Sequence, residues 1–313
     1  MQFGLMIHHG PEMAERNMWD TTAAFALAAE SSGFASIWLA DHFQIEAPYN
    51  SPGWSPMLEV FCGLSALAAI TSRVRIGQLV IGNPYRNPAL TAKMATSLDI
   101  ISHGRSILGI GGGWHKPEYD SYGWDDWPEL PERLKRLEDA VQLILEMWGT
   151  GHIDYAGKYY RAVAALNDPP SVQRPHPPLL IGGSGEKVTL KLVAKYADWA
   201  NCMGDPESIS RKFGILREHC QTVGRDYDTI VKSHFLWTIV GRTESEVAAK
   251  IAYLGPRKRA FFGLSGTPSQ LIDSFGELAR AGVEHCIIQL NGEIEPETVQ
   301  LFGEEVIPKL ANA

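Results

Sequence analysis

The segment most informative about the architecture reads Ser106-Ile107-Leu108-Gly109-Ile110-Gly111-Gly112-Gly113-Trp114. Its apolar first half predicts a short buried strand, and four glycines within five residues follow. Because glycine has no β-carbon, the backbone there can approach a large flat molecule closely. The pattern predicts a binding loop at the carboxyl end of a strand, with a glycine-rich turn that binds nothing as the alternative.

Neither common nucleotide-binding glycine motif fits this segment. The dinucleotide fingerprint needs Gly-x-Gly-x-x-Gly at the start of a helix and an acidic residue about 20 residues later. Here the third glycine is misplaced, and Trp114 and Pro117 follow where the helix should begin. The phosphate loop needs a Lys followed by Ser or Thr, which this segment lacks. Both motifs are therefore excluded.

The composition limits the class of protein. The chain has 313 residues, 45% hydrophobic and 20% charged, which allows a large core and a single domain over residues 1–313. The net charge of -8, without a Lys/Arg stripe, argues against nucleic acid or an anionic membrane as a partner. Neither a signal peptide nor a membrane-spanning apolar run is evident, so a cytoplasmic protein is expected. The 4 cysteines lie far apart, which predicts reduced thiols and no zinc site.

Strand and helix patterns alternate along the chain. Pro88 stands at a predicted helix start, and Gly104 and Gly149 stand just after helix ends. Residues 149–178 break the alternation with an aromatic hairpin-like piece and five prolines, and are interpreted as an insertion between strands four and five. The predicted strands cover residues 3–7, 36–40, 74–81, 106–110, 179–181, 198–202, 230–240 and 284–290. Eight such units predict an α/β fold, the (β/α)8 TIM barrel, with an open doubly wound sheet as the alternative.

The candidate site residues follow or end these predicted strands. A (β/α)8 barrel builds its site from the loops at the carboxyl ends of its strands, so such residues are expected at one mouth. They are His8, His9, Asp41, His42, Gly111, Gly112, Gly113, Trp114, Gly182, Gly183, Ser184, Gly185 and Trp237. The other histidines form no metal-ligand spacing, so no metal site is expected.

The pair Asp41-His42 is the strongest candidate for acid–base chemistry. An imidazole titrates near pH 6.5 and can carry a proton or stabilise negative charge, while the adjacent carboxylate can hold other groups. The structural alternative is that His42 merely ends a strand and Asp41 caps a turn.

A second glycine segment, Gly182-Gly183-Ser184-Gly185, precedes a helix predicted from Lys187 to Tyr196. Free backbone N–H groups at a helix start can cradle a phosphate, although an ordinary βα turn would also fit. Two glycine segments at one mouth favour a ligand with a flat part and a phosphate. His8, His9, Trp114 and Trp237 would line an apolar substrate pocket, although a single aromatic residue more often anchors a core or a loop.

Several longer segments resemble the bacterial luciferase-like flavin and deazaflavin oxidoreductases, in particular the branch that uses coenzyme F-420. The resemblance covers nearly the whole chain. Its main carriers are Gly33–Phe43, Tyr85–Lys93, Ser102–Trp114 and Pro178–Gly185. It implies a barrel with the coenzyme ring in its mouth, the phosphate on Gly182–Gly185 and Gly111–Gly113 close by.

The resemblance also implies roles for individual residues. Asp41 and His42 would lie beside the ring, with His42 supporting hydride chemistry. Residues Gln78 to Val80 would form a bulge against the ring, in some relatives with a non-prolyl cis peptide, so Leu79 and Val80 are implied as coenzyme-binding residues. A small-molecule substrate is implied, and relatives are commonly dimers, which suggests a homodimer.

One position departs from the family's pattern. Relatives that dehydrogenate alcohols or sugar phosphates carry a glutamate in the loop after the fourth strand, and Gly112 stands there instead. This departure favours a reductase of activated C=C or C=N bonds.

Three functions thus compete. The preferred one is an F-420-dependent oxidoreductase that transfers a hydride to or from a small organic molecule, which needs stacking of the substrate and exclusion of water but no covalent nucleophile. The second is an FMN-dependent luciferase-like monooxygenase. The third, of another class, is a barrel that binds a flavin without turnover.

Overall fold

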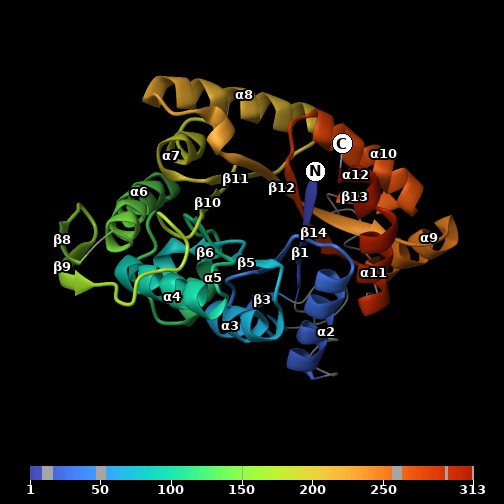
Figure 1. The fold of residues 1–313 in the computed structure, drawn as a ribbon, viewed down its shortest axis with the longest axis horizontal. Coiled ribbons are helices and arrows are strands. Elements are labelled where there is room, and N and C mark those ends of the chain that lie inside the picture. Colours follow the sequence, from blue (N-terminus) through green and yellow to red (C-terminus); the bar gives the residue numbers. More distant parts are fainter. Residues whose placement is uncertain (9–16, 47–53, 150, 256–262, 293–294, 312–313) are drawn as a thin grey trace.

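The computed structural model describes residues 1–8, 17–46, 54–149, 151–255, 263–292 and 295–311. In this part of the chain, eight parallel strands form a closed ring with helices around it (Figure 1). They pair in the order β10, β11, β12, β14, β1, β2, β5 and β7, and β7 pairs with β10. Because that last pairing closes the ring, the predicted (β/α)8 barrel is confirmed and the open sheet is excluded. The ring consists of β1 (Gln2–Met6), β2 (Ser36–Leu39), β5 (Arg75–Gln78), β7 (Ser106–Gly111), β10 (Leu179–Gly182), β11 (Trp199–Cys202), β12 (Val231–Val240) and β14 (His285–Leu290).

Helices cover the outside of the ring, and local sequence fixes where several of them begin. In α8, the Asp205 side chain accepts a hydrogen bond from Ser208 N at 2.8 Å, Pro206 occupies the first turn, and Gly224 ends the helix at φ 70°. The helices are α2 (Met18–Ser31), α3 (Val60–Ile70), α4 (Pro88–Ile101), α6 (Leu130–Met147), α7 (Thr189–Tyr196), α8 (Pro206–Val223), α9 (Glu244–Tyr253), α10 (Pro268–Arg280), α11 (Pro296–Glu305) and α12 (Ile307–Leu310). No described helix is long and apolar enough to cross a membrane.

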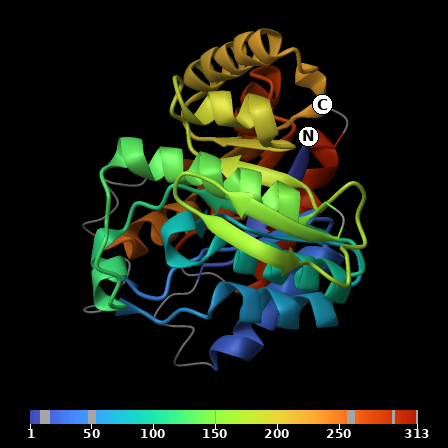
Figure 2. The ribbon, with the colours of Figure 1, turned by 90° about the vertical axis from the view of Figure 1, so that its left-hand side faces the viewer.

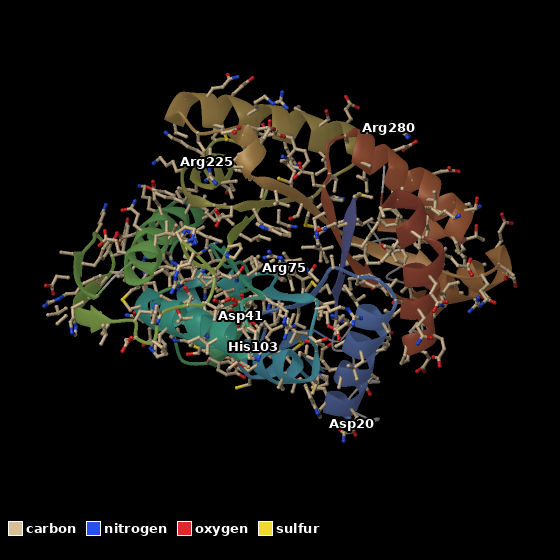
Figure 3. The ribbon with its side chains drawn as sticks, in the orientation of Figure 1. Asp20, Asp41, Arg75, His103, Arg225 and Arg280 are labelled. Atoms are coloured by element: carbon tan, nitrogen blue, oxygen red, sulfur yellow. The ribbon has the colours of Figure 1, made fainter. Side chains whose placement is uncertain are left out.

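Two apolar layers flank the strands. Between strands and helices lies the main core, which includes Phe3, Ile37 and Phe302. Inside the ring lies a smaller cluster, which includes Trp38 and Trp199 with ring centroids 6.1 Å apart. Charged side chains such as Asp20 and Arg280 lie at the periphery, whereas Asp41 lies in the interior (Figure 3).

The predicted insertion is a hairpin of β8 (His152–Ala156) and β9 (Arg161–Leu166), which lies against α6 (Figure 2). Asp139 of α6 fastens it. Its carboxylate accepts hydrogen bonds from Tyr155 OH at 2.7 Å, Tyr159 N at 2.6 Å and Tyr160 N at 3.0 Å. The hairpin therefore covers a helix outside the ring.

Several short elements were not predicted. These are β3 (Ile45–Glu46), β4 (Trp54–Ser55), β6 (Ile81–Gly82), η1 (Asn83–Tyr85), α5 (Lys116–Ser121), η2 (Tyr227–Thr229) and β13 (Gly263–Gly266). The prediction of a single strand over residues 74–81 is wrong, because the strand is interrupted between β5 and β6, where a cis peptide joins Leu79 and Val80. This break is the bulge that the resemblance implied.

Candidate functional site

The loops at the carboxyl ends of the strands meet at one mouth, and the two glycine segments lie side by side there. Ile110 of β7 is in register with Ile181 of β10. A β-carbon built at Gly111 would lie 3.6 Å from the carbonyl oxygen of Gly182. The two segments therefore lie at the same mouth, and their binding of one ligand stays a prediction.

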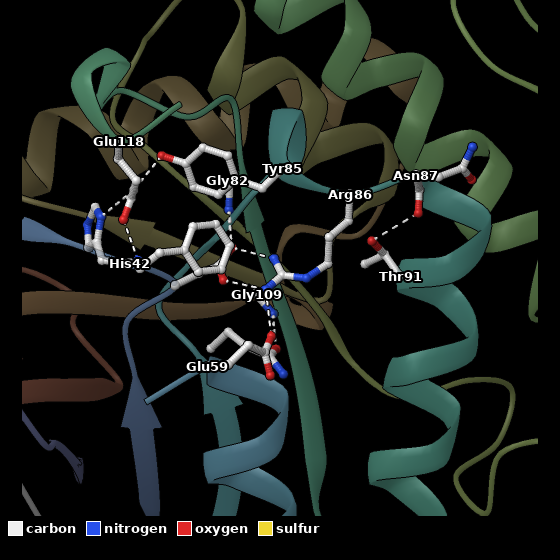
Figure 4. Close-up of polar contacts among 12 residues, drawn as sticks. His42, Glu59, Gly82, Tyr85, Arg86, Asn87, Thr91, Gly109 and Glu118 are labelled. Atoms are coloured by element: carbon white, nitrogen blue, oxygen red, sulfur yellow. Dashed lines mark hydrogen bonds and ion pairs between the residues drawn. The ribbon is translucent and has the colours of Figure 1, made fainter. Parts of the chain in front are cut away.

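His42 follows β2 and pairs with a residue that the sequence analysis missed. Its Nδ1 lies 3.0 Å from Oε2 of Glu118 on α5, and their side chains are 15% and 0% exposed (Figure 4). Glu118 Oε2 also accepts a hydrogen bond from Tyr85 OH at 2.7 Å. Phe43 N and Gln44 N donate to the other oxygen, Oε1. The buried carboxylate of Glu118 is therefore held by four groups, which are the His42 imidazole, the Tyr85 hydroxyl and the two backbone N–H groups.

These contacts set the charge of Glu118. Burial alone would raise the pKa of Glu118, but the hydrogen bonds from His42, Tyr85 and Gln44 outweigh burial and lower it. Burial and the neighbouring Glu118 raise the pKa of the Tyr85 hydroxyl. At neutral pH the carboxylate is therefore ionised and the phenol is protonated.

Glu118 could have been found from Lys116-Pro117-Glu118, since proline followed by an acidic residue is typical of a first helical turn. The sequence analysis noted only that Gly112 stands where relatives that dehydrogenate alcohols or sugar phosphates carry a glutamate. Gly112 does stand there, but Glu118 lies in the same loop, six residues later, so this loop does supply an acid.

Asp41 is held by protein groups. Its side-chain oxygens accept hydrogen bonds from both terminal nitrogens of Arg86 at 2.8 Å and from Gly82 N at 3.0 Å, and the residue is 3% exposed. Arg86 also pairs with Glu59 of α3 at 2.6 Å. Burial raises the pKa of Asp41, and Arg86 opposes that shift. In this structure Asp41 fixes the loop that carries His42, and a part for it in the chemistry stays a prediction.

The bulge between β5 and β6 explains three of the glycines. A β-carbon at Gly109 would lie 1.9 Å from the carbonyl oxygen of Gln78. At Gly111 and Gly182 it would lie 2.9 Å and 2.8 Å from side-chain carbons of Val80. These glycines thus accommodate the bulge, rather than a ligand alone. Leu79 and Val80 remain half-buried above the apolar cluster inside the ring.

The second glycine segment offers free backbone donors. Gly183 adopts φ 123°, which favours glycine, and its N–H donates to Asn201 O. Ser184 Oγ accepts a hydrogen bond from Met203 N at 3.0 Å, so this hydroxyl is partly engaged. Among the described residues, the N–H groups of Ser184, Gly185 and residue 186 donate to no backbone carbonyl. Helix α7 begins at Thr189, two residues later than predicted.

A cavity of about 240 Å³ opens beside the first glycine segment. Trp127 lies 3.5 Å from a β-carbon built at Gly113, and the guanidinium of Arg133 lies over the Trp127 ring at 4.5 Å. Within the described part of the chain, Arg133 pairs with no carboxylate, although it donates to Pro128 O. The cavity is lined by Asn83, Pro84, Tyr85, Arg86, Asn87, Tyr119, Trp124, Pro128, Arg133, Arg136 and Tyr160. Sequence reasoning missed Arg133, because only the folded chain shows that no described carboxylate pairs with its guanidinium.

The residues predicted to line the substrate pocket lie in surroundings that differ from one residue to the next. His8 follows β1, and burial together with the nearby His42 lowers its pKa to about 4. Trp114 is 66% exposed, with its ring centroid 5.5 Å from that of His42. Trp237 is half-buried in β12, in register with Gln289. His9 lies outside the described residues.

Comparisons with known proteins agree with this architecture. The chain is 28% identical to the F-420-dependent glucose-6-phosphate dehydrogenase of Microbacterium testaceum, over 91% of this chain and 92% of that protein. It is 31% identical to the pyrimidine monooxygenase RutA of Enterobacter cloacae, over 62% of this chain and 53% of that protein.

Among solved structures, the F-420-dependent tetrahydromethanopterin reductase of Methanopyrus kandleri superposes with a TM-score of 0.79 at 21% identity, covering 98% of each chain. An F-420-dependent secondary alcohol dehydrogenase superposes with a TM-score of 0.82 at 21% identity, covering 99% of this chain and 98% of that one. Both likenesses concern the fold. A family model described as luciferase-like monooxygenase matches residues 1–262, and the chain therefore belongs to the luciferase-like monooxygenase family of enzymes.

Proposed function

We propose that this enzyme is a coenzyme F-420-dependent oxidoreductase that oxidises a small hydroxylated molecule to a carbonyl compound. The observation that carries the proposal is the imidazole of His42, paired with buried Glu118 at the mouth of the barrel. A neutral imidazole can accept the proton of a substrate hydroxyl, and the adjacent carboxylate stabilises the imidazolium that forms.

The choice of direction rests on Glu118. The sequence favoured a reductase because Gly112 stands where relatives that dehydrogenate alcohols or sugar phosphates carry a glutamate. Glu118 lies in the same loop and contacts His42, so we infer that it takes the place of the acid missing at position 112, which supports a dehydrogenase. The similarity to an F-420-dependent glucose-6-phosphate dehydrogenase over 91% of the chain supports the same direction.

The mouth fits a planar, phosphorylated coenzyme. The half-buried side chains of Leu79 and Val80 supply an apolar surface for a flat ring. The free N–H groups of Ser184 and Gly185 would hold a phosphate, and the guanidinium of Arg133, in the cavity near Gly113, would hold another anionic group. Bound deazaflavin would supply the hydride acceptor. His42 would take the hydroxyl proton, and exposed Trp114 would cover the substrate and exclude water.

Binding and turnover test the proposal in turn. The enzyme is titrated with F-420 and with FMN, followed by fluorescence, and then assayed with glucose 6-phosphate and a panel of secondary alcohols. We expect micromolar binding of F-420 and formation of reduced coenzyme with at least one alcohol. His42→Ala should bind F-420 as the wild type does but reduce it at least 100-fold more slowly. Unchanged turnover in His42→Ala would refute the role of His42.

The similarity to pyrimidine monooxygenase RutA supports a second candidate, an FMN-dependent monooxygenase. Binding of FMN without binding of F-420, followed by oxygen-dependent product formation, would favour it. A protein that binds either coenzyme without any turnover would instead be the non-catalytic flavin-binding barrel. A cytoplasmic homodimer remains our expectation, and light scattering of the purified protein tests the dimer.

A further inference from the structure

The two oxygens of Glu118 have separate tasks. Oε1 accepts hydrogen bonds from the main-chain N–H groups of Phe43 and Gln44, so it holds the loop after β2. Oε2 accepts from Tyr85 OH at 2.7 Å and lies 3.0 Å from Nδ1 of His42 (Figure 4). The carboxylate thus ties the backbone next to His42 with one oxygen and the imidazole itself with the other.

We propose that Glu118 is a positioning residue, which keeps the proton of neutral His42 on Nδ1 and leaves Nε2 as an unprotonated acceptor. An ionised carboxylate can only accept hydrogen bonds, so the ring nitrogen that faces it must carry the hydrogen. The Glu118 side chain is 0% exposed, so water does not compete for Oε2. Among the described residues, His42 Nε2 has no hydrogen-bond partner, so its lone pair stays available to a bound molecule.

The charged and titratable neighbours do not favour the opposite tautomer. His8 is neutral at pH 7, because burial and His42 lower its pKa to about 4. The His115 ring lies edge-on to His42, with centroids 5.9 Å apart. The Tyr85 hydroxyl donates a hydrogen bond to Glu118, and the Arg86 guanidinium forms an ion pair with Asp41. Of these groups, only Glu118 forms a hydrogen bond with the imidazole.

This inference rests on the proposed function only for what Nε2 then does. With its lone pair on Nε2, resting His42 takes a proton and does not give one. Substrates that must lose a hydroxyl proton would therefore react with the resting enzyme. Substrates that need a proton would react only after His42 has been protonated.

Nitrogen-15 NMR of the full chain, without coenzyme or substrate, tests the tautomer directly. Histidine-labelled protein is recorded over a pH series that is raised until the His42 signals stop changing, and these signals are assigned by comparison with His42→Ala. We expect Nδ1 of His42 to carry the hydrogen and Nε2 to show the chemical shift of an acceptor nitrogen. A hydrogen on Nε2 in the wild type would overturn the proposal, whichever coenzyme the enzyme uses.

Glu118→Gln is the decisive variant. The amide oxygen can still accept from Phe43 N and Gln44 N, which leaves the amide NH2 group against His42 Nδ1. Because this NH2 donates, the hydrogen of His42 should move to Nε2 in the NMR spectrum. Ser121→Ala is the matched control on α5, since it removes the hydrogen bonds of the Ser121 hydroxyl with Gln44 Nε2, at 3.0 Å, and Pro117 O, at 2.8 Å, but no bond of Glu118 or His42, and should leave the tautomer unchanged. An unchanged tautomer in Glu118→Gln would overturn the proposal.

Kinetics separate positioning from folding and from the proposed function. If Glu118 acts through His42, Glu118→Gln should lower kcat at least tenfold and flatten its rise with pH, while coenzyme affinity stays within twofold. Equal losses of coenzyme affinity and kcat would indicate a purely structural role and refute positioning. If no F-420 turnover is found in the wild type but the tautomer moves as expected, the proposed function fails and the positioning role stands.

Discussion

Arg86 donates hydrogen bonds to both oxygens of Asp41, each at 2.8 Å, and so binds η1 to the loop after β2. We predict that Asp41→Ala lowers the free energy of unfolding by on the order of 3 kcal/mol, because it leaves a buried guanidinium without its main partner. Urea unfolding measures this loss. The control is Asp120→Ala, which breaks an exposed pair with Lys116 and should cost less than about 1 kcal/mol. Similar losses for the two variants would contradict a structural role for Asp41.

The bulge requires glycine at position 109. We predict that Gly109→Ala destabilises the protein by about 3 kcal/mol or more, because its β-carbon would overlap the Gln78 carbonyl oxygen, 1.9 Å away. Gly214→Ala in α8 is the control, since nothing lies within 4 Å of its β-carbon. It should stabilise the helix by about 1 kcal/mol. Thermal unfolding compares the two, and equal effects would show that the bulge tolerates a methyl group.

Buried histidines should make stability depend on pH. Burial lowers the pKa of His285 to about 3, below the ordinary value of 6.5. The unfolded chain therefore binds more protons between these values, and stability falls as the pH drops through this window. We predict that His285→Gln reduces the slope by up to about 1.4 kcal/mol per pH unit. Urea unfolding at pH 7, 6, 5 and 4 measures the slope. His152→Gln changes an exposed histidine and should leave the slope unaltered.

Trp114 should act on the substrate alone. It is 66% exposed and lies beside His42, so we predict that Trp114→Ala raises KM for the substrate about tenfold through loss of apolar contact. Coenzyme affinity, measured by fluorescence titration, should stay within twofold. Trp114→Phe keeps an aromatic surface and should retain most of the affinity for substrate. A loss confined to coenzyme binding would assign Trp114 to the coenzyme instead.

Arg133 should hold an anionic group of the coenzyme. We predict that Arg133→Met weakens F-420 binding by about tenfold or more, as expected for a charge-assisted hydrogen bond. The effect should shrink as salt is added, since salt screens the charge. Lys135→Met removes the same charge from an exposed position on the same helix and should leave binding unchanged. Equal effects would mean that only net charge matters.

Local sequence patterns predicted most of the fold. Helix α8 is an example of local signals, because Asp205 and Pro206 mark its start and Gly224 marks its end, each directly at the boundary. The two strands whose pairing closes the ring were predicted over residues 106–110 and 179–181 from short apolar runs beside turn residues. The insertion was found because its aromatic and proline-rich composition departs from the alternation.

What the sequence did not predict depends on contacts between distant parts of the chain. Glu118 and His42 are 76 positions apart, and Arg86 and Asp41 are 45 apart, so no local pattern reports either pairing. Likewise, Gly109 was interpreted as clearance for a ligand, whereas its neighbour is the carbonyl of Gln78 on another strand. Residue type indicated that these positions matter, but only the folded chain shows what each one touches.

The exposed Cys62 lies next to Glu59, which is paired with Arg86, and Arg86 is in turn paired with Asp41. Within the described residues the other cysteines, Cys202, Cys220 and Cys286, are buried. Cys62 N donates to Glu59, whose other oxygen pairs with Arg86, and the nearby Glu59 raises the pKa of the Cys62 thiol. The rate at which a coloured reagent alkylates the Cys62 thiol should therefore change when these ion pairs at the mouth of the barrel are disturbed. This rate can be followed by absorbance without any engineered label.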